Sequence, residues 1–123
     1  MAAPWVSRPA SPTLEEVQRV RLRAVGRVQA NLNMGLELRG AFLRAGLGEP
    51  ALTAEVLIGG GRGWPGFAYV EATIRSLIET WKRAGLEGAE DLVLDGLAAR
   101  IEREIGDEGT LILQPFAGAW ARV

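Results

Sequence analysis

The loop formed by residues 59–66, GGGRGWPG, contains the glycine spacing G-x-G-x-x-G at Gly61, Gly63 and Gly66. Glycines with this spacing let the backbone approach a pyrophosphate that sits at a helix N-terminus. The loop follows an apolar run that reads as a strand and precedes a segment with helical periodicity, as the motif requires. A dinucleotide site would also need a second strand after that helix, with an acidic residue about 20 positions beyond the glycines.

The surroundings of this loop favour a connecting role over phosphate binding. The helix after the loop runs into another helix, Glu87 falls in the turn between them, and Pro65 removes an amide that should face phosphate. Trp64 and Tyr69 flank the loop, and mobile loops of this kind can open and close over small ligands. These two aromatic residues are therefore candidates for a pocket that binds a small apolar molecule.

The sequence contains neither histidine nor cysteine. This excludes Ser-His-Asp and Cys-His nucleophiles, thiol redox chemistry and the usual zinc sites. Acid–base chemistry would have to use Asp, Glu, Lys, Arg or the single tyrosine, and Glu55, Glu71 and Asp95 are candidate carboxylates by elimination, with a surface position as the alternative for each. The sequence alone assigns no catalytic residue and no metal ligand.

The charges of the chain are nearly balanced, with 14 Lys and Arg against 15 Asp and Glu. Arginine is in mild excess before residue 48 and acidic residues are in excess after it, which is too weak a pattern to indicate nucleic-acid binding. No apolar run reaches about 18 residues, and the first residues lack the pattern of a signal peptide. We therefore expect a cytoplasmic protein without a membrane span.

Hydrophobic periodicity predicts an α+β fold, in which about four helices pack on a short antiparallel strand pair. Residues 1–12 read as an irregular lead-in and residues 13–123 as a single domain, in which Thr13 and Glu16 have the spacing of a capping box. The expected order is helix, helix, strand, helix, helix, strand. The helices are expected over residues 14–31, 33–46, 67–84 and 94–105, and the strands over residues 51–58 and 110–122, the second with a bulge near Pro115.

Two segments resemble the C-terminal half of class I S-adenosylmethionine-dependent methyltransferases, notably the ubiquinone/menaquinone-biosynthesis type and its natural-product relatives. Residues 33–47, NMGLELRGAFLRAGL, are similar to the family's G-x-x-L-x-x-L-x-x-A-G-L helix, which a strand follows. Residues 78–86, IETWKRAGL, and the ending QPFAGAW at residues 114–120 are similar to its helix pair and closing strand. The lead-in WVS at residues 5–7 resembles the stretch after the family's fourth or fifth strand.

This resemblance covers nearly the whole chain, but only the half of the family that lacks the cofactor-binding loop. It implies a truncated Rossmann-like fold with no cofactor-binding residue of its own, and S-adenosylmethionine binding only if the missing half is supplied. It also implies that five residues line a substrate cavity: Trp5, Asn33, Arg39, Trp64 and Tyr69. Each has a structural alternative, such as a solvated side chain for Arg39, a helix cap for Asn33 and a plug over the first helix for Trp5.

Three functions stay open at this point. The chain could be the substrate-binding and lid part of a methyltransferase, a stand-alone small-molecule-binding or tailoring protein of the cyclase or isomerase kind, or a structural or partner-binding module. Because an isolated pair of strands is only marginally stable in water, we expect a homodimer or a complementary cofactor-binding chain to complete the sheet.

Overall fold

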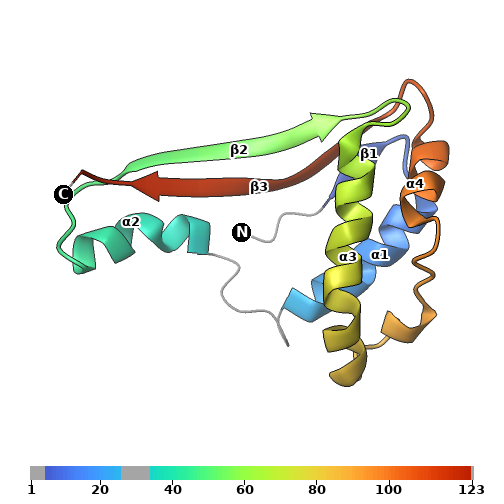
Figure 1. The fold of residues 1–123 in the computed structure, drawn as a ribbon, viewed down its shortest axis with the longest axis horizontal. Helices are drawn as coiled ribbons and strands as arrows, with labels where there is room; N and C mark the ends of the chain where they lie inside the picture. Colours follow the sequence, from blue (N-terminus) through green and yellow to red (C-terminus); the bar gives the residue numbers. More distant parts are fainter. Residues whose placement is uncertain (1–4, 26–33, 123) are drawn as a thin grey trace.

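The computed structural model describes residues 5–25 and 34–122 (Figure 1). Its helices are α1 (Pro12–Val25), α2 (Met34–Arg44), α3 (Pro65–Arg83) and α4 (Leu97–Ile105), with a short 3₁₀ turn η1 (Ala89–Asp91). Its strands are β1 (Val6–Arg8), β2 (Ala51–Gly59) and β3 (Thr110–Trp120), which form an antiparallel sheet in the order β1-β3-β2. The expected α+β class is confirmed.

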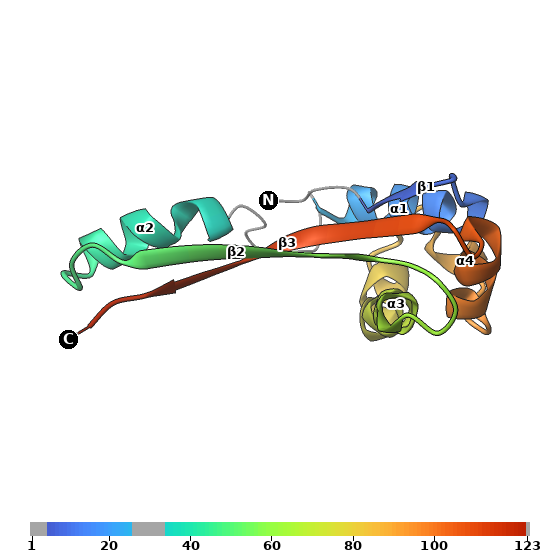
Figure 2. The ribbon, with the colours of Figure 1, turned by 90° about the horizontal axis from the view of Figure 1, so that it is seen from above.

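The elements are arranged in two regions (Figure 1). The body consists of α1, α3, η1, α4 and β1 together with the adjoining ends of β2 and β3. The two longer strands continue away from the body as a ribbon, and α2 lies beside the far end of this ribbon (Figure 2). We call this second region the arm and define it as residues 34–58, which include α2 and most of β2, and residues 115–120 of β3.

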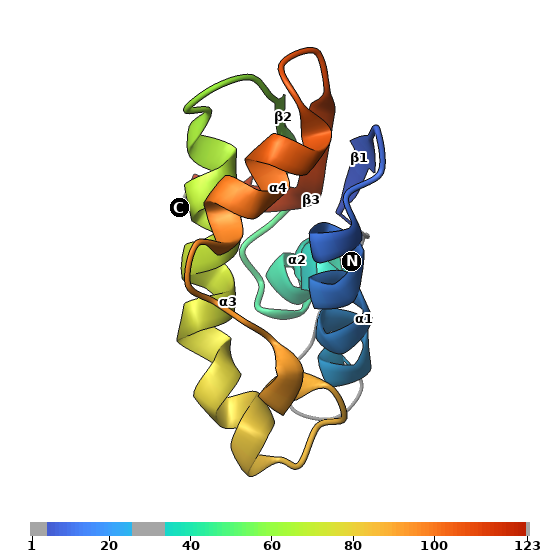
Figure 3. The ribbon, with the colours of Figure 1, turned by 90° about the vertical axis from the view of Figure 1, so that its right-hand side faces the viewer.

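The hydrophobic core lies in the body. The periodic stripe of α3 is buried as its spacing predicts, and it faces the apolar side of α4 and the two buried leucines at the start of β3. Seen along the arm, α3 and α1 flank α4 (Figure 3). The residues with the largest side chains among the fully buried ones are Trp81, Ile74, Leu97, Ile101, Ile105, Leu111 and Leu113.

The N-terminus of α1 differs from the expected capping box. The helix begins at Pro12, and Ser11 caps it because its hydroxyl accepts the backbone N–H of Leu14 at 3.1 Å. Thr13 instead donates its N–H and its hydroxyl to the Glu104 carboxylate, at 2.8 and 2.6 Å. The box at Thr13 and Glu16 is therefore wrong: proline is preferred at the first helical position, which moves the cap to Ser11.

The lead-in is also more ordered than expected over its second half. Val6, Ser7 and Arg8 form β1, which pairs with Ile112, Leu111 and Thr110, and Trp5 is buried. A strand of three residues is too short to show an alternating pattern, so only its long-range pairing with β3 reveals it. The burial of Trp5 in the core cluster fits the structural alternative for this residue, a plug over the first helix.

Most of the other elements follow the sequence. Both Gly46 and Gly48 adopt positive φ just after α2, as expected for a glycine-terminated helix. The register of β2 and β3 shifts between Val56 and Ile58, next to Pro115, which confirms the expected bulge. The fourth helix begins at Leu97 rather than Leu94, because the preceding residues form η1 and a turn. The part of the expected first helix that lies beyond residue 25 falls outside the described residues.

Candidate functional site

Of the four described residues among the five expected to line a cavity, the structure separates Arg39 from the other three. Asn33 lies outside the described residues. Arg39 lies on α2 in the arm, where its guanidinium Nε is 2.6 Å from the Glu49 carboxylate, and both side chains are exposed. The hydrogen bond to Glu49 raises the pKa of Arg39, as does the charge of that carboxylate. The other three residues, Trp5, Trp64 and Tyr69, belong to the body.

Trp5 and Tyr69 are brought together by Gln114. The Trp5 indole N–H donates to the Gln114 side-chain oxygen, and the Gln114 amide donates to the Tyr69 hydroxyl at 3.0 Å. The Arg21 guanidinium lies 4.3 Å from the centre of the Trp5 ring, which is a cation–π contact. Burial lowers the pKa of Arg21, and the charge of Tyr69 opposes this shift. Tyr69 also meets Phe116 edge to face, with ring centres 6.1 Å apart. This network fixes β3 to α3 and to the N-terminal segment where the arm leaves the body.

Trp64 explains part of the glycine content of its loop. The indole packs edge to face on Phe67, with ring centres 5.4 Å apart. A Cβ atom added at Gly59 or at Gly66 would come within 2.4 or 2.1 Å of the Trp64 ring. The indole therefore occupies the space that side chains at these two positions would fill. Packing of Trp64 thus accounts for Gly66, the third glycine of the G-x-G-x-x-G spacing.

A phosphate-binding loop needs backbone N–H groups that are free to bind phosphate, but in this loop one of them already binds a carboxylate. The backbone N–H of Gly63, the second glycine of that spacing, donates to the Glu102 carboxylate on α4. A phosphate would have to displace this carboxylate and would be repelled by it. The geometry supports the connecting role of the loop.

The three candidate carboxylates, Glu55, Glu71 and Asp95, lie in different surroundings. Glu71 accepts the backbone N–H of Ala98 at 3.0 Å, and this hydrogen bond is the main cause of its lowered pKa. Arg75 lies 3.3 Å from Glu71 and 3.3 Å from Asp95, so these two acids form a surface ion-pair cluster that ties α3 to the start of α4. Glu55 is exposed on β2, opposite Phe116. The structure does not bring the three into one site.

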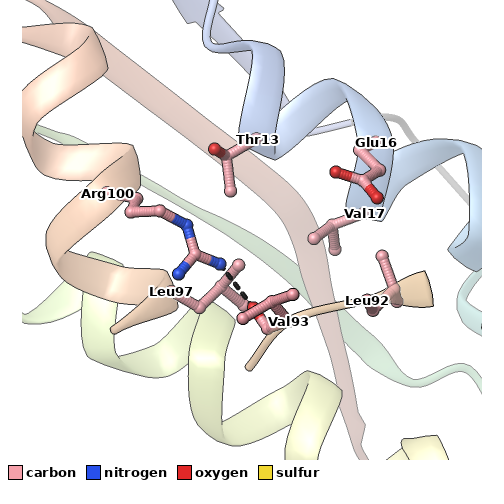
Figure 4. Close-up of a pocket in the computed structure, with 7 residues that line it drawn as sticks. All are labelled: Thr13, Glu16, Val17, Leu92, Val93, Leu97 and Arg100. Atoms are coloured by element: carbon pink, nitrogen blue, oxygen red, sulfur yellow. Dashed lines mark hydrogen bonds between the residues drawn. The ribbon is translucent and has the colours of Figure 1, made fainter. Parts of the chain in front are cut away.

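A shallow pocket of about 300 Å³ lies between α1 and α4 (Figure 4). Its polar groups are largely engaged within the protein: Arg100 donates to the backbone oxygens of Val93 and Asp95, and the Thr13 hydroxyl donates to Glu104. The remaining lining is apolar apart from the carboxylate of Glu16. The pocket therefore offers no pair of groups that could act as acid and base.

The described residues contain no cluster of three or more acidic side chains that could hold a metal ion. Within the same ranges, no helix is long and apolar enough to cross a membrane.

The arm carries many exposed apolar residues. Every residue of β2 from Ala51 to Ile58 is exposed, although most are apolar. Glu55 is the single charged residue of the two strands that form the ribbon. Nine large apolar side chains of the arm are between 41 and 69% exposed: Leu36, Leu43, Leu47, Leu52, Val56, Leu57, Ile58, Phe116 and Trp120. We call these nine side chains the arm surface.

A row of exposed apolar residues continues from the arm onto the body. Directly opposed residues of an antiparallel pair share a face of the sheet. Ile58 is opposite Ile112, and Ile112 is opposite Val6, so these three side chains lie side by side across the strands. All three are exposed, while Leu111, which alternation places on the other face, is buried against the core. We call Leu52, Val56, Ile58, Ile112 and Val6 the sheet stripe.

Sequence reasoning expected the strand pair to need a partner, but it did not identify the exposed side chains of the arm surface. The available signal was the low charge of residues 51–58 and the aromatic residues at positions 116 and 120 of the other strand. Such strands carry apolar side chains on both faces and need cover on both. The sequence does not say whether the cover comes from the same chain.

Comparison with known protein families, curated proteins and solved structures found no match to this chain.

Proposed function

We propose that this protein is an assembly module whose arm packs against a second copy of the same chain. The observation that carries this proposal is the exposure of β2, an apolar strand that has no buried residue from Ala51 to Ile58. Water-exposed apolar strands are costly, and a two-stranded ribbon with one helix is marginal by itself. A partner that covers the arm would shield its apolar residues from water and would stabilise the ribbon.

The amount of apolar surface supports a stable association. An aromatic side chain buries roughly 150–250 Å² of surface. The arm surface has two aromatic and seven aliphatic side chains, which are on average about half exposed. Summed over α2 and both faces of the ribbon, the exposed parts reach at most on the order of 800 Å², about the area that each partner contributes to a typical stable interface. The near absence of charge on the ribbon matches the composition of homodimer interfaces.

The features of the chain favour a second copy over a foreign partner. Each copy carries a projecting apolar arm and also an exposed apolar patch on its body, formed by Val6 and Ile112 of the sheet stripe. Two such copies can cover each other's apolar surfaces around a two-fold axis, which is the commonest symmetry of soluble oligomers. This is the partner-binding function among the three that the sequence left open.

Sedimentation of matched variants tests the proposal. The wild-type chain is expected to form dimers or larger assemblies at micromolar concentration. The double variant Leu52→Ser, Trp120→Ser removes two exposed side chains of the arm and is expected to weaken association at least about 10-fold, since each side chain is worth about 1.5–3 kcal/mol when buried. Val93→Ser is the control, because Val93 is equally apolar and 64% exposed but lies in the body.

Far-UV circular dichroism shows whether the variants keep their helices. A wild-type chain that sediments as a monomer at 100 µM, on the order of a hundred times a micromolar dissociation constant, would refute the proposal. Equal weakening by Val93→Ser would show that association does not use the arm.

The methyltransferase-like function implied by the resemblance stays a prediction. It gains support from Gln114, which joins Trp5 and Tyr69, two of the residues expected at a substrate cavity. Its test is a titration with S-adenosylmethionine up to millimolar concentration, followed by tryptophan fluorescence at two protein concentrations. Binding that requires a complementary cofactor-binding chain would support it, and absence of binding with that chain present would refute it.

A further inference from the structure

We infer that two copies join through the outer edges of their β2 strands, which pair antiparallel across a two-fold axis. The two three-stranded sheets then form one continuous sheet with the β2 strands at its centre. This inference rests on the proposed assembly and specifies its geometry. Backbone hydrogen bonds hold such a pair, and apolar side chains of the two β2 strands lie side by side on the faces of the joined sheet.

The outer edge of β2 is open along its whole length. In the order β1-β3-β2, β2 pairs with β3 on one side only, and none of the described strands pairs with its other side. Figures 1 and 2 show none of the described helices beside this edge along the arm. It has nine residues, one of them charged and none a proline. Proteins normally protect an edge of this length with charges, proline or a covering element.

The other edge of the ribbon is protected. β1 pairs with residues 110–112 of β3, and further along the strand Pro115 lacks the N–H that a new neighbour would need. The helix α2 lies along β3, so close that a Cβ atom at Gly35 would come within 3.0 Å of the Ala117 side chain. A partner strand therefore has access to β2 and not to the far part of β3.

The charge of Glu55 restricts the register. If the axis passed through Glu55, the two carboxylates would lie directly opposite each other, which is unfavourable. An axis through Thr53 places Glu55 of one copy opposite Ala51 of the other, and an axis through Leu57 places it opposite Gly59. Both registers also bring the sheet stripes of the two copies together. The axis is therefore expected at a residue of β2 other than Glu55.

The absence of cysteine from the sequence makes cross-linking a direct test. Single cysteines are introduced at positions 52, 53, 54, 56, 57 and 58, with Val93→Cys on the body as the control, and the proteins are oxidised mildly and separated on a non-reducing gel. A disulfide requires Cα atoms about 4.4–6.8 Å apart. Directly opposed residues of an antiparallel pair satisfy this at about 4.5–5.5 Å, and a displacement of two residues along the strands, about 7 Å, does not.

Edge pairing predicts one maximum of cross-linking, at the β2 position that lies on the axis, for example in the Thr53→Cys or the Leu57→Cys variant. Similar cross-linking at several of the alternate positions 52, 54, 56 and 58, with no single maximum, would mean that the copies pack face to face, which overturns edge pairing but keeps the assembly. Edge pairing is likewise overturned if the variants sediment as dimers and none of the β2 positions cross-links. If the wild-type chain sediments as a monomer, the proposed assembly fails and this inference fails with it.

Discussion

The body and the arm of this molecule differ in how they use apolar residues. In the body, Val70 and Ile74 of α3 are completely buried among neighbours from α4 and the sheet. In the arm, Leu52 and Val56 alternate along β2 in the same regular way, yet nearly half of each side chain is exposed. Regular patterning therefore specifies an apolar face in both regions, but only the body supplies the cover for it. In the proposed assembly, a second copy supplies the cover that the arm lacks.

The helices show the same contrast. The sequence predicts amphipathic segments for both α2 and α3, and the structure contains both. The stripe of α3 is covered, while Leu36 of α2 is 69% exposed. A helix in a protein gains most of its stability from the packing of its apolar face. Because Leu36 is exposed, α2 has less of this packing than α3.

The largest expected effect is the difference between substitutions in α3 and in α2 in how far they lower the free energy of unfolding. Ile74→Ala removes a fully buried side chain and should lower the free energy of unfolding by about 2–5 kcal/mol. Leu36→Ala in α2 should change it by less than about 0.5 kcal/mol at concentrations where the chain is monomeric, because the side chain is exposed. Urea denaturation followed by circular dichroism measures both. Equal destabilisation by the two substitutions would remove the distinction between body and arm.

A smaller effect concerns the link between α1 and α4 in the body. The Glu104 carboxylate accepts hydrogen bonds from the Ser11 hydroxyl, at 2.8 Å, and from Thr13. Burial alone would raise the pKa of Glu104, but these hydrogen bonds outweigh it and lower the pKa below its ordinary value of 4.5. Glu104→Ala should cost about 1–3 kcal/mol at neutral pH, because the donors lose their partner.

The pH dependence follows from the direction of this shift. A lowered pKa in the folded state means that the stabilisation is fully present above about pH 4.5 and is lost as the pH falls through the folded-state pKa. Glu71, whose pKa is also lowered, contributes in the same window. Unfolding measured from pH 7 to pH 3 should therefore show a weaker acid dependence for Glu104→Gln than for the wild type. An unchanged acid dependence would contradict the assigned role of Glu104.

The smallest effect is expected for the ion pair of the arm. Arg39 and Glu49 are both exposed, and exposed pairs contribute little to stability because solvent screens them. Arg39→Ala should leave the melting temperature unchanged within error, in contrast to Glu104→Ala. A clear loss of stability at low protein concentration would mean that the arm is held more firmly by itself than we propose.

The sequence predicts the elements of this fold well where local patterns decide. The spacing of Phe67, Ile74 and Trp81 predicts α3, and alternation with a bulge near Pro115 predicts the two long strands. It fails where contacts distant in sequence decide: β1 exists because it pairs with β3, and Ser11 is the cap that precedes a proline. These features depend on neighbours that a short window of sequence does not contain.

The candidate site was harder to predict than the fold. Trp5 and Tyr69 do lie in one network, but Gln114, the residue that joins them, was not among the candidates. Arg39 lies in the arm, and Trp64 fills the loop instead of lining a cavity. Whether an apolar strand is covered depends on the placement of every other element, so the arm surface emerges only in three dimensions.

Hydrogen exchange measured at two protein concentrations tests the central claim most directly. The amides of α3 should be protected equally at 1 µM and 100 µM, chosen about a hundredfold apart so that mass action shifts the association equilibrium. The amides of β2 should exchange quickly at the lower concentration and become protected at the higher one, because association closes the arm. Strong protection of β2 that is the same at both concentrations would show that the arm is stable in the monomer and would contradict the account.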